Sequence, residues 1–140
     1  MQLAKPDICA RFKTWLIAWD EYDLETVMDW MHEEVVFENW DGLTVNGKAA
    51  LQKIWTPWFI FNGNFKFISE AEVVDEAAQQ IAFQWRYEGP SFEKEYKGKQ
   101  EIRRGTDIIS LLEGKIVRKT SYSKTCIQIE AQPLILGVKK

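Results

Sequence analysis

The feature that most constrains the fold of this chain is a change in the spacing of its apolar residues near Asn62-Gly63-Asn64. Before that point, apolar residues recur every three or four positions, which is typical of helices, and after it they alternate, which is typical of strands. A block of helices followed by a block of strands predicts an α+β domain. The chain has 140 residues, so we expect residues 1–140 to form a single domain.

The first half of the sequence predicts two helices and one strand. A first helix is expected over residues 7–20, with Asp7 as its N-cap, because apolar residues occupy one helical face. A second helix is expected to begin after Asp23, whose carboxylate is well placed as its N-cap. The β-branched and aromatic run over residues 35–40 indicates a strand.

The rest of the chain predicts a third helix and an antiparallel meander. The helix covers residues 47–58, and Pro57 is expected to end or kink it, because proline removes a backbone donor. Turn-length connections between the later strands require antiparallel pairing. The three helices and one curved sheet then enclose a hollow that the inner sheet face lines. The four strands are expected over residues 65–74, 80–88, 97–112 and 115–129.

Composition and charge exclude several classes of function. The net charge is −3, which disfavours a nucleic-acid partner, and no apolar run is long enough to span a membrane. The start of the chain does not resemble a signal peptide, and two cysteines, Cys9 and Cys126, are expected to be free thiols in a reducing cytoplasm. The single histidine, His32, is expected in a solvated loop. We therefore expect no metal site and, without a Gly-rich nucleotide loop, no cofactor.

Four passages of the sequence carry a resemblance to a known family. They are Trp19-Asp-Glu-Tyr-Asp23-Leu-Glu, Met31-His-Glu-Glu-Val-Val-Phe-Glu-Asn39, Val45-Asn-Gly47-Lys-Ala-Ala-Leu, and Arg104-Gly-Thr-Asp107-Ile-Ile-Ser-Leu-Leu-Glu-Gly114-Lys-Ile. In this order and spacing they resemble the nuclear transport factor 2-like superfamily, in its SnoaL-like polyketide cyclase and ketosteroid isomerase branch. The resemblance implies a cystatin-like, cone-shaped α+β barrel, in which a curved antiparallel sheet packs with three helices around a deep pocket.

Asp107 is the first candidate catalytic residue. It shares strand parity with Ile109 and Leu111, so its carboxyl is expected on the buried face, where desolvation would raise its pKa. The resemblance implies that an acid at this position stays protonated and donates a hydrogen bond to a developing oxyanion. The alternative is an ion pair with Arg103 or Arg104, or a hydrogen bond from a backbone amide.

Two other positions implied by the resemblance do not carry suitable groups. The catalytic base falls at Asn39, an amide that cannot take a proton, and the tyrosine of the oxyanion hole falls at Trp15. Asp41 shares strand parity with Asn39 and is the candidate replacement base. The alternative for Asp41 is a structural role in the Asp41-Gly42 turn.

The aromatic content of 14% predicts a small-molecule pocket with aromatic walls. Tyr122 is expected either to bring a hydroxyl to the pocket or to pack under the first helix. The expected ligand-binding residues are Trp15, Trp19, Phe37, Asn39, Trp55, Trp58, Phe59, Phe83, Trp85, Tyr87, Ile109 and Tyr122.

These observations predict a cytoplasmic domain that binds a small, largely apolar or aromatic molecule. Cofactor-free isomerase, cyclase or lyase chemistry would use Asp107 and Asp41. The alternative is a non-catalytic ligand-binding or dimerisation module that has lost the acid–base pair. A homodimer is expected, because the outward face of the last strands is too apolar to be fully exposed to solvent, and exposed apolar patches usually mark contacts. This face carries Ile102, Thr106, Ile108, Ser110 and Leu112.

Overall fold

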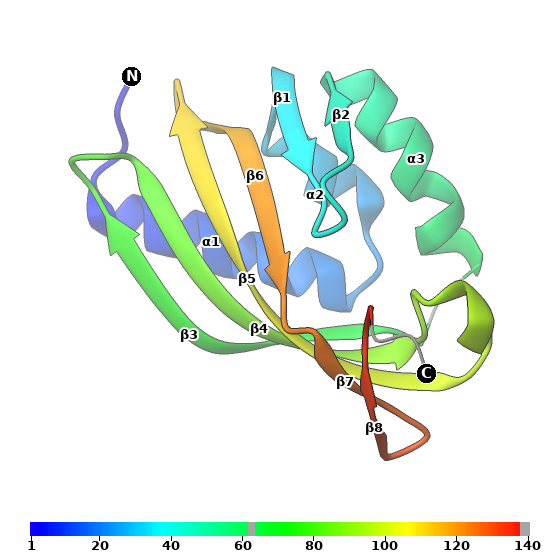
Figure 1. Ribbon diagram of the computed structural model, residues 1–140. Helices are drawn as coiled ribbons and strands as arrows, with labels where there is room; N and C mark the ends of the chain where they lie inside the picture. The colour runs from blue at the N-terminus through cyan, green and yellow to red at the C-terminus, as the bar shows by residue number, and fades with distance from the viewer. Residues whose placement is uncertain (62–63, 138–140) are drawn as a thin grey trace.

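The computed structural model describes residues 1–61 and 64–137, which form three α-helices and a strongly curved sheet (Figure 1). The helix α1 (Lys5–Asp20) lies across one face of the long strands, and α3 (Lys48–Phe61) lies beside β1 (Met31–Glu38) and β2 (Thr44–Asn46) at one end of the sheet. This arrangement confirms the α+β cone. The elements are α1 (Lys5–Asp20), α2 (Leu24–Asp29), β1 (Met31–Glu38), β2 (Thr44–Asn46), α3 (Lys48–Phe61), β3 (Lys66–Asp75), β4 (Gln80–Pro90), a 3₁₀ turn (Lys94–Tyr96), β5 (Gln100–Leu112), β6 (Lys115–Ser123), β7 (Cys126–Ile129) and β8 (Gln132–Ile135).

The sheet has the order β2-β1-β6-β5-β4-β3, and β7 and β8 extend it beside β5. The strands β3 to β6 form the expected antiparallel meander. The pairing of β1 with β6 is parallel, so the expectation of a wholly antiparallel sheet is wrong. Between β1 and β6 the chain passes through β2, α3, β3, β4 and β5, and it returns beside β1 in the same direction.

The last expected strand, over residues 115–129, is two strands in the structure. Glu101 and Ile102 at the start of β5 pair with β7, and the residues from Gly105 onward pair with β6. One long strand therefore has two successive partners on the same edge. The chain leaves β6 after Ser123 and rejoins the sheet at Cys126.

The helix ends differ in part from the expected ones. The N-cap of α1 is Ala4, and Asp7 lies in the first turn, so the prediction of Asp7 as the cap is wrong. The prediction for Asp23 is confirmed, since its Oδ1 accepts a hydrogen bond of 3.1 Å from the Thr26 amide. The Thr26 hydroxyl and amide both hold the pKa of Asp23 below its usual value.

Pro57 lies inside α3, which continues to Phe61, so proline does not end this helix. Proline leaves the carbonyl of the residue four positions earlier, Lys53, without its helical donor. Both Lys53 and Pro57 are exposed, and water can satisfy that carbonyl. No described helix is long and apolar enough to cross a membrane.

The core is formed mainly by aromatic and branched side chains between α1 and the inner sheet face. The strand β4 alternates as expected, with Ile81, Phe83, Trp85 and Tyr87 buried. Asp107 and Ile109 on β5 share that buried face. The parity predicted for both strands is therefore confirmed, and it places one carboxylate inside an aromatic interior.

Candidate functional site

An interior cavity of about 270 Å³ lies between α1, α3 and the inner face of the sheet. A narrow extension of about 30 Å³ continues inward, and Trp19, Phe67, Asp107 and Lys119 border both spaces. The larger space is lined by Trp19, Phe37, Asn39, Trp40, Ile54, Trp55, Trp58, Phe67, Trp85, Phe92, Asp107, Lys119 and Ser121.

A buried ion pair between Asp107 and Lys119 forms the polar floor of this cavity. Lys119 Nζ lies 2.9 Å from Asp107 Oδ2, and the Trp85 indole N–H donates to Asp107 Oδ1 at 3.0 Å. Lys119 also donates to Ser121 Oγ at 3.2 Å. The exposed fraction is 4% for Asp107 and 8% for Lys119, so protein groups have largely replaced water around both charges.

Asp107 is in an ion pair, as the predicted alternative requires, but its partner differs from the one expected. Its partner is Lys119, whereas Arg103 pairs with Glu101 and Glu93. Arg104 points away from the interior and pairs with Glu70 at 2.8 Å. The expectation of Arg103 or Arg104 as the partner is wrong.

The ammonium of Lys119 also lies against two aromatic rings. Its Nζ is 4.7 Å from the centroid of the Phe37 ring and 5.8 Å from the Trp55 ring. Cation–π attraction compensates part of the hydration that the buried ammonium loses. The cation is therefore held by a carboxylate, a hydroxyl and two ring faces.

Gly105 makes room for the indole that contacts Asp107. It pairs across the sheet with Trp85, and a Cβ at position 105 would lie 2.4 Å from Trp85 Cζ2 and 2.3 Å from the Tyr122 carbonyl oxygen. Only glycine leaves space for the Trp85 ring at this crossing. The Trp85 indole can then extend along β5 to Asp107, which lies two residues after Gly105.

A second buried ionic cluster supports two half-buried rings that line the cavity, Trp40 and Phe92. We call this part of the cavity its mouth. Arg103 is 1% exposed and donates to Glu101 Oε2 at 2.9 Å, to Glu93 Oε2 at 2.7 Å and to Ser123 Oγ at 2.9 Å. Its guanidinium carbon lies 4.8 Å from the Trp40 ring and 5.8 Å from the Phe92 ring. Arg103 therefore supports two rings that line the cavity.

Tyr87 lies beside this second cluster. Its hydroxyl donates to the Pro90 carbonyl at 2.6 Å. Burial raises the pKa of Tyr87 well above its usual value, and the negative charge of Glu101 adds to the increase. Tyr87 is part of the support of the mouth and does not line the cavity.

Most of the predicted ligand-binding residues lie at this site, and three belong to the core alone. Trp19, Phe37, Asn39, Trp55, Trp58, Trp85 and Asp107 line the cavity, and Trp15 and Phe83 line its extension. Phe59, Tyr87 and Ile109 are buried but line neither space. The Trp15 N–H donates to the Val27 carbonyl at 3.0 Å, which occupies its only donor.

Three other predicted residues have different surroundings from those expected. Asp41 is exposed and its Oδ1 accepts a hydrogen bond of 2.9 Å from the Leu43 amide, as the turn alternative predicts. Tyr122 is 60% exposed on the outer sheet face, so neither expected position for it is correct. His32 lies within β1, where its Nδ1 accepts from the Glu34 amide at 3.0 Å; the expected loop is wrong.

Sequence reasoning missed several residues of the cavity, of which Lys119 and Ser121 matter most chemically. Their position depends on the register of the hairpin between β5 and β6, which sets Asp107 opposite Ser121 and Ile109 opposite Lys119. That register contains an irregularity between Ser110 and Leu111, for which the alternation of the sequence gives no signal. The other missed residues are Trp40, Ile54, Phe67 and Phe92.

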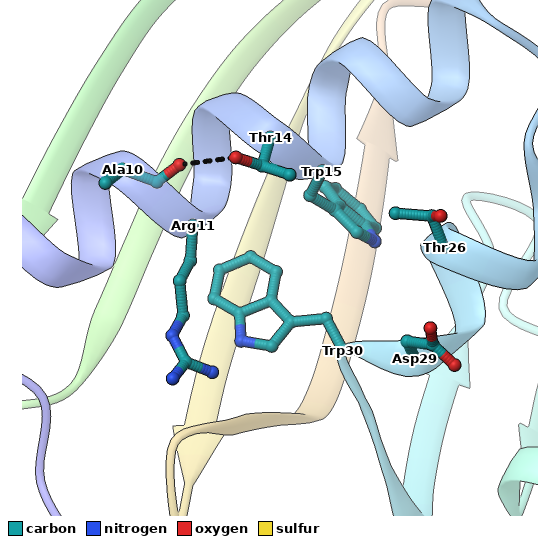
Figure 2. A pocket seen from close by; sticks show the side chains of 7 residues that line it. All are labelled: Ala10, Arg11, Thr14, Trp15, Thr26, Asp29 and Trp30. Carbon is teal, nitrogen blue, oxygen red and sulfur yellow. Dashed lines mark hydrogen bonds between the residues drawn. The ribbon is translucent and has the colours of Figure 1, made fainter.

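A separate surface groove of about 330 Å³ lies between α1 and α2 (Figure 2). In Figure 2, Arg11 and Asp29 lie on opposite sides of Trp30. The indoles of Trp15 and Trp30 donate to the Val27 and Gly114 carbonyls, and the two residues are only 3% and 7% exposed. Both indole N–H groups of the groove are therefore engaged. In the interior cavity, the Lys119 ammonium has two oxygen partners among the described residues and keeps a third N–H. The interior cavity is therefore the stronger candidate.

The sequence matches a family model, and the fold matches solved structures. A family model described as a SnoaL-like domain matches residues 12–119. No curated protein matches the sequence. Among the described residues, no group of three or more His, Cys, Asp or Glu side chains is placed to hold a metal ion.

Several solved structures share the fold at low sequence identity. The crystal structure of TerC co-crystallised with polyporic acid is 14% identical with a TM-score of 0.68, covering 84% of this chain and 92% of that chain. SalBIII, an epoxide hydrolase/cyclase-like enzyme with a role in pyran ring formation in salinomycin, is 12% identical with a TM-score of 0.72, covering 86% and 92%. A cystatin-like protein of unknown function from Methylobium petroleophilum PM1 is 16% identical with a TM-score of 0.68, covering 100% and 86%.

Proposed function

Because this chain belongs to the SnoaL-like domain family, we propose that its interior cavity binds a small, largely apolar or aromatic molecule. The observation that carries this proposal is an aromatic cavity of about 270 Å³ with one buried ion pair on its floor. Small-molecule sites are commonly apolar clefts of about 300–1,000 Å³ with a few placed polar groups. A cavity just below that range suits a ligand of one or two rings.

The ion pair gives this site cofactor-free acid–base chemistry. The Asp107 carboxylate accepts a proton from a carbon next to a ligand carbonyl, and the neighbouring Lys119 ammonium stabilises the enolate oxygen that results. Both groups lie within 2.9 Å of each other, so the charges stay balanced as the proton moves. This is the proton transfer that isomerase-like and cyclase-like reactions need.

Two similar structures support the ligand class. TerC was crystallised with polyporic acid, and SalBIII has a role in forming a pyran ring. Both proteins are at most 14% identical in sequence to this chain. They therefore support the general class of ligand and not a particular compound.

The test uses 2-acetylnaphthalene, which has two fused rings and exchangeable hydrogens beside its carbonyl. Titration calorimetry should detect saturable binding, and NMR in D₂O should show faster deuteration of its methyl group with protein than without. The Asp107→Asn variant should keep binding and lose most of the acceleration, by about 10²–10⁴-fold for a general base. Asp41→Asn is the matched control, because Asp41 serves a surface turn, and it should leave both measurements unchanged.

The outcomes separate the two functional classes. Binding with protein-dependent exchange supports the enzyme. Binding without exchange supports a non-catalytic ligand-binding module, which the amide at Asn39 and the engaged indole of Trp15 favour. The absence of any saturable binding contradicts the proposed cavity function in both forms.

A homodimer through the outer sheet face is the second part of the proposal. Ile102 and Ile108 are only half-buried there, and Leu112 and Tyr122 are 46% and 60% exposed. Apolar surface of this kind commonly marks a contact between proteins. Sedimentation velocity at micromolar concentration should give a dimer, and Ile108→Glu should give a monomer; a wild-type monomer contradicts this part.

A further inference from the structure

Lys119 is the only buried lysine among residues 1–61 and 64–137. Lysine is almost never fully buried unless it is paired. A buried ion pair can commonly be replaced by apolar residues without loss of stability, so stability alone does not explain this one. Lys119 lines the cavity and its extension, which places its primary amine within reach of a bound molecule.

The surroundings of this amine are those of a nucleophile with an adjacent acid–base group. Asp107 Oδ2 lies 2.9 Å from Lys119 Nζ, and Ser121 Oγ lies 3.2 Å away. An ammonium has three N–H donors, and these two oxygens engage two of them. The third has no oxygen partner among the described residues, and the amine lies 4.7 Å from the ring centroid of Phe37 and 5.8 Å from that of Trp55.

We propose that Lys119 condenses with the carbonyl group of an aromatic aldehyde or ketone in the cavity and forms an iminium. This inference rests on the proposed function, because the carbonyl compound must first occupy the cavity. Lysine amines in apolar pockets are established nucleophiles toward carbonyl groups.

The reaction balances without any oxidant or reductant. Asp107 takes a proton from the ammonium, and the free amine forms a bond to the carbonyl carbon while the C=O π electrons move to oxygen. A proton passes from nitrogen to that oxygen, with Ser121 in position to relay it. Asp107 then returns its proton, the C–O bond breaks, water leaves and the nitrogen lone pair forms C=N.

The products are one iminium and one water, and the Asp107 carboxylate is restored. The iminium carries the same single positive charge as the original ammonium, opposite the same carboxylate. The cavity floor therefore keeps its charge balance from reactant to product, and the loss of an ion pair does not oppose the reaction.

Reductive trapping tests this inference directly. The protein is incubated with substoichiometric 2-naphthaldehyde and sodium cyanoborohydride, whose hydride converts an iminium into a stable secondary amine, and peptides are mapped by mass spectrometry. Lys124 is an exposed lysine close in sequence and serves as the internal control. Binding in the cavity should label Lys119 at least about tenfold faster than Lys124, because the reactants are held together.

Variants and a competitor identify the cause of the labelling. Lys119→Met should remove the fast label, and Asp107→Asn should slow it without changing labelling at Lys124. Unreactive 2-methylnaphthalene should compete at Lys119 only. Circular dichroism of each variant checks that it is folded.

Two results overturn the proposal and are distinguishable. If calorimetry shows that 2-methylnaphthalene binds while Lys119 is labelled no faster than Lys124, the iminium proposal is wrong and the binding function stands. If 2-methylnaphthalene does not bind and Lys119 is not preferentially labelled, the proposed function fails with it.

Discussion

Two buried ionic clusters include residues of β5 that are only four positions apart, Arg103 and Asp107, and they differ in how many of their hydrogen-bonding groups are engaged. At the mouth, Arg103 engages Glu101, Glu93 and Ser123, and Glu101 also accepts from the Ser91 hydroxyl and the Phe92 amide. At the floor, Lys119 and Asp107 bond to each other and to one neutral donor or acceptor each.

The difference indicates separate roles for the two clusters. The mouth cluster has no direct contact with the cavity, since neither Arg103 nor Glu101 lines it, and its bonds fix a loop and two rings. Four of the five N–H donors of Arg103 are engaged. The floor cluster borders the cavity, and one N–H of Lys119 has no oxygen partner among the described residues. A densely bonded network away from the cavity specifies structure, whereas a pair with spare capacity next to the cavity is available for chemistry.

The largest expected effect is the loss of the mouth cluster. Arg103→Met should cost about 3–5 kcal/mol, because it leaves the fully buried Glu101 carboxylate without its partner. Lys119→Met should cost less, about 1–3 kcal/mol, because Asp107 keeps its bond from Trp85 and water can enter the cavity. Guanidinium unfolding measures both values, and equal losses would contradict the comparison.

A smaller loss is expected where β4 and β5 cross. Gly105→Ala should cost about 1–3 kcal/mol, since the new methyl group overlaps the Trp85 ring and the Tyr122 backbone. It should also weaken binding of 2-acetylnaphthalene, because Trp85 no longer supports Asp107. Thr106→Ala, on the outer face, is the matched control and should stay within about 0.5 kcal/mol of the wild type. Unchanged stability and binding in Gly105→Ala would refute the role assigned to this glycine.

Removing both partners of the floor pair should nearly restore stability. Asp107→Leu with Lys119→Met should lie within about 1 kcal/mol of the wild type, because no unpaired charge remains. The double variant should nevertheless lose deuterium exchange and Lys119 labelling. Unfolding melts of the single and double variants give the coupling energy, and additive losses would show that the two residues are not coupled.

The smallest effect on stability at neutral pH is expected at Tyr87, and this effect should become measurable at alkaline pH. The folded protein holds the Tyr87 proton more tightly than the unfolded chain, so stability should fall as pH rises above the usual tyrosine pKa of about 10, by at most about 1.4 kcal/mol per pH unit. Tyr87→Phe removes this contribution. Its melts should depend less steeply on pH than the wild type between about pH 10 and 11, and parallel curves would contradict the assignment.

The alternation of β4 and β5 was enough to predict the inner face that carries Trp85 and Asp107. Alternation could not predict that Lys119 lies on the inner face, because the pairing of β5 with β6 shifts by one residue between Ser110 and Leu111. A regular hairpin continuing the pairing of Leu111 with Ile116 would place Lys119 opposite Ile108, on the outer face. The local irregularity moves the lysine inward, and alternation alone contains no sign of it.

The parallel pairing of β1 with β6 could not be predicted from the alternation of the sequence either. It joins segments more than 80 residues apart, such as Met31 and Ile116, and depends on how the helices direct the chain back to the sheet. Phe37 reaches the cavity through this pairing, opposite Lys119, and Asn39 follows directly after β1. Turn residues identified the local hairpins, but no turn connects these two strands.

The aromatic walls of the cavity also make the protein a reporter of its own occupancy. Five of the seven tryptophans line the larger space, namely Trp19, Trp40, Trp55, Trp58 and Trp85. An occupant that absorbs near the emission band of indole would receive excitation energy from several of them at close range. Occupancy could therefore be followed by intrinsic fluorescence in real time, without a dye or an immobilised partner.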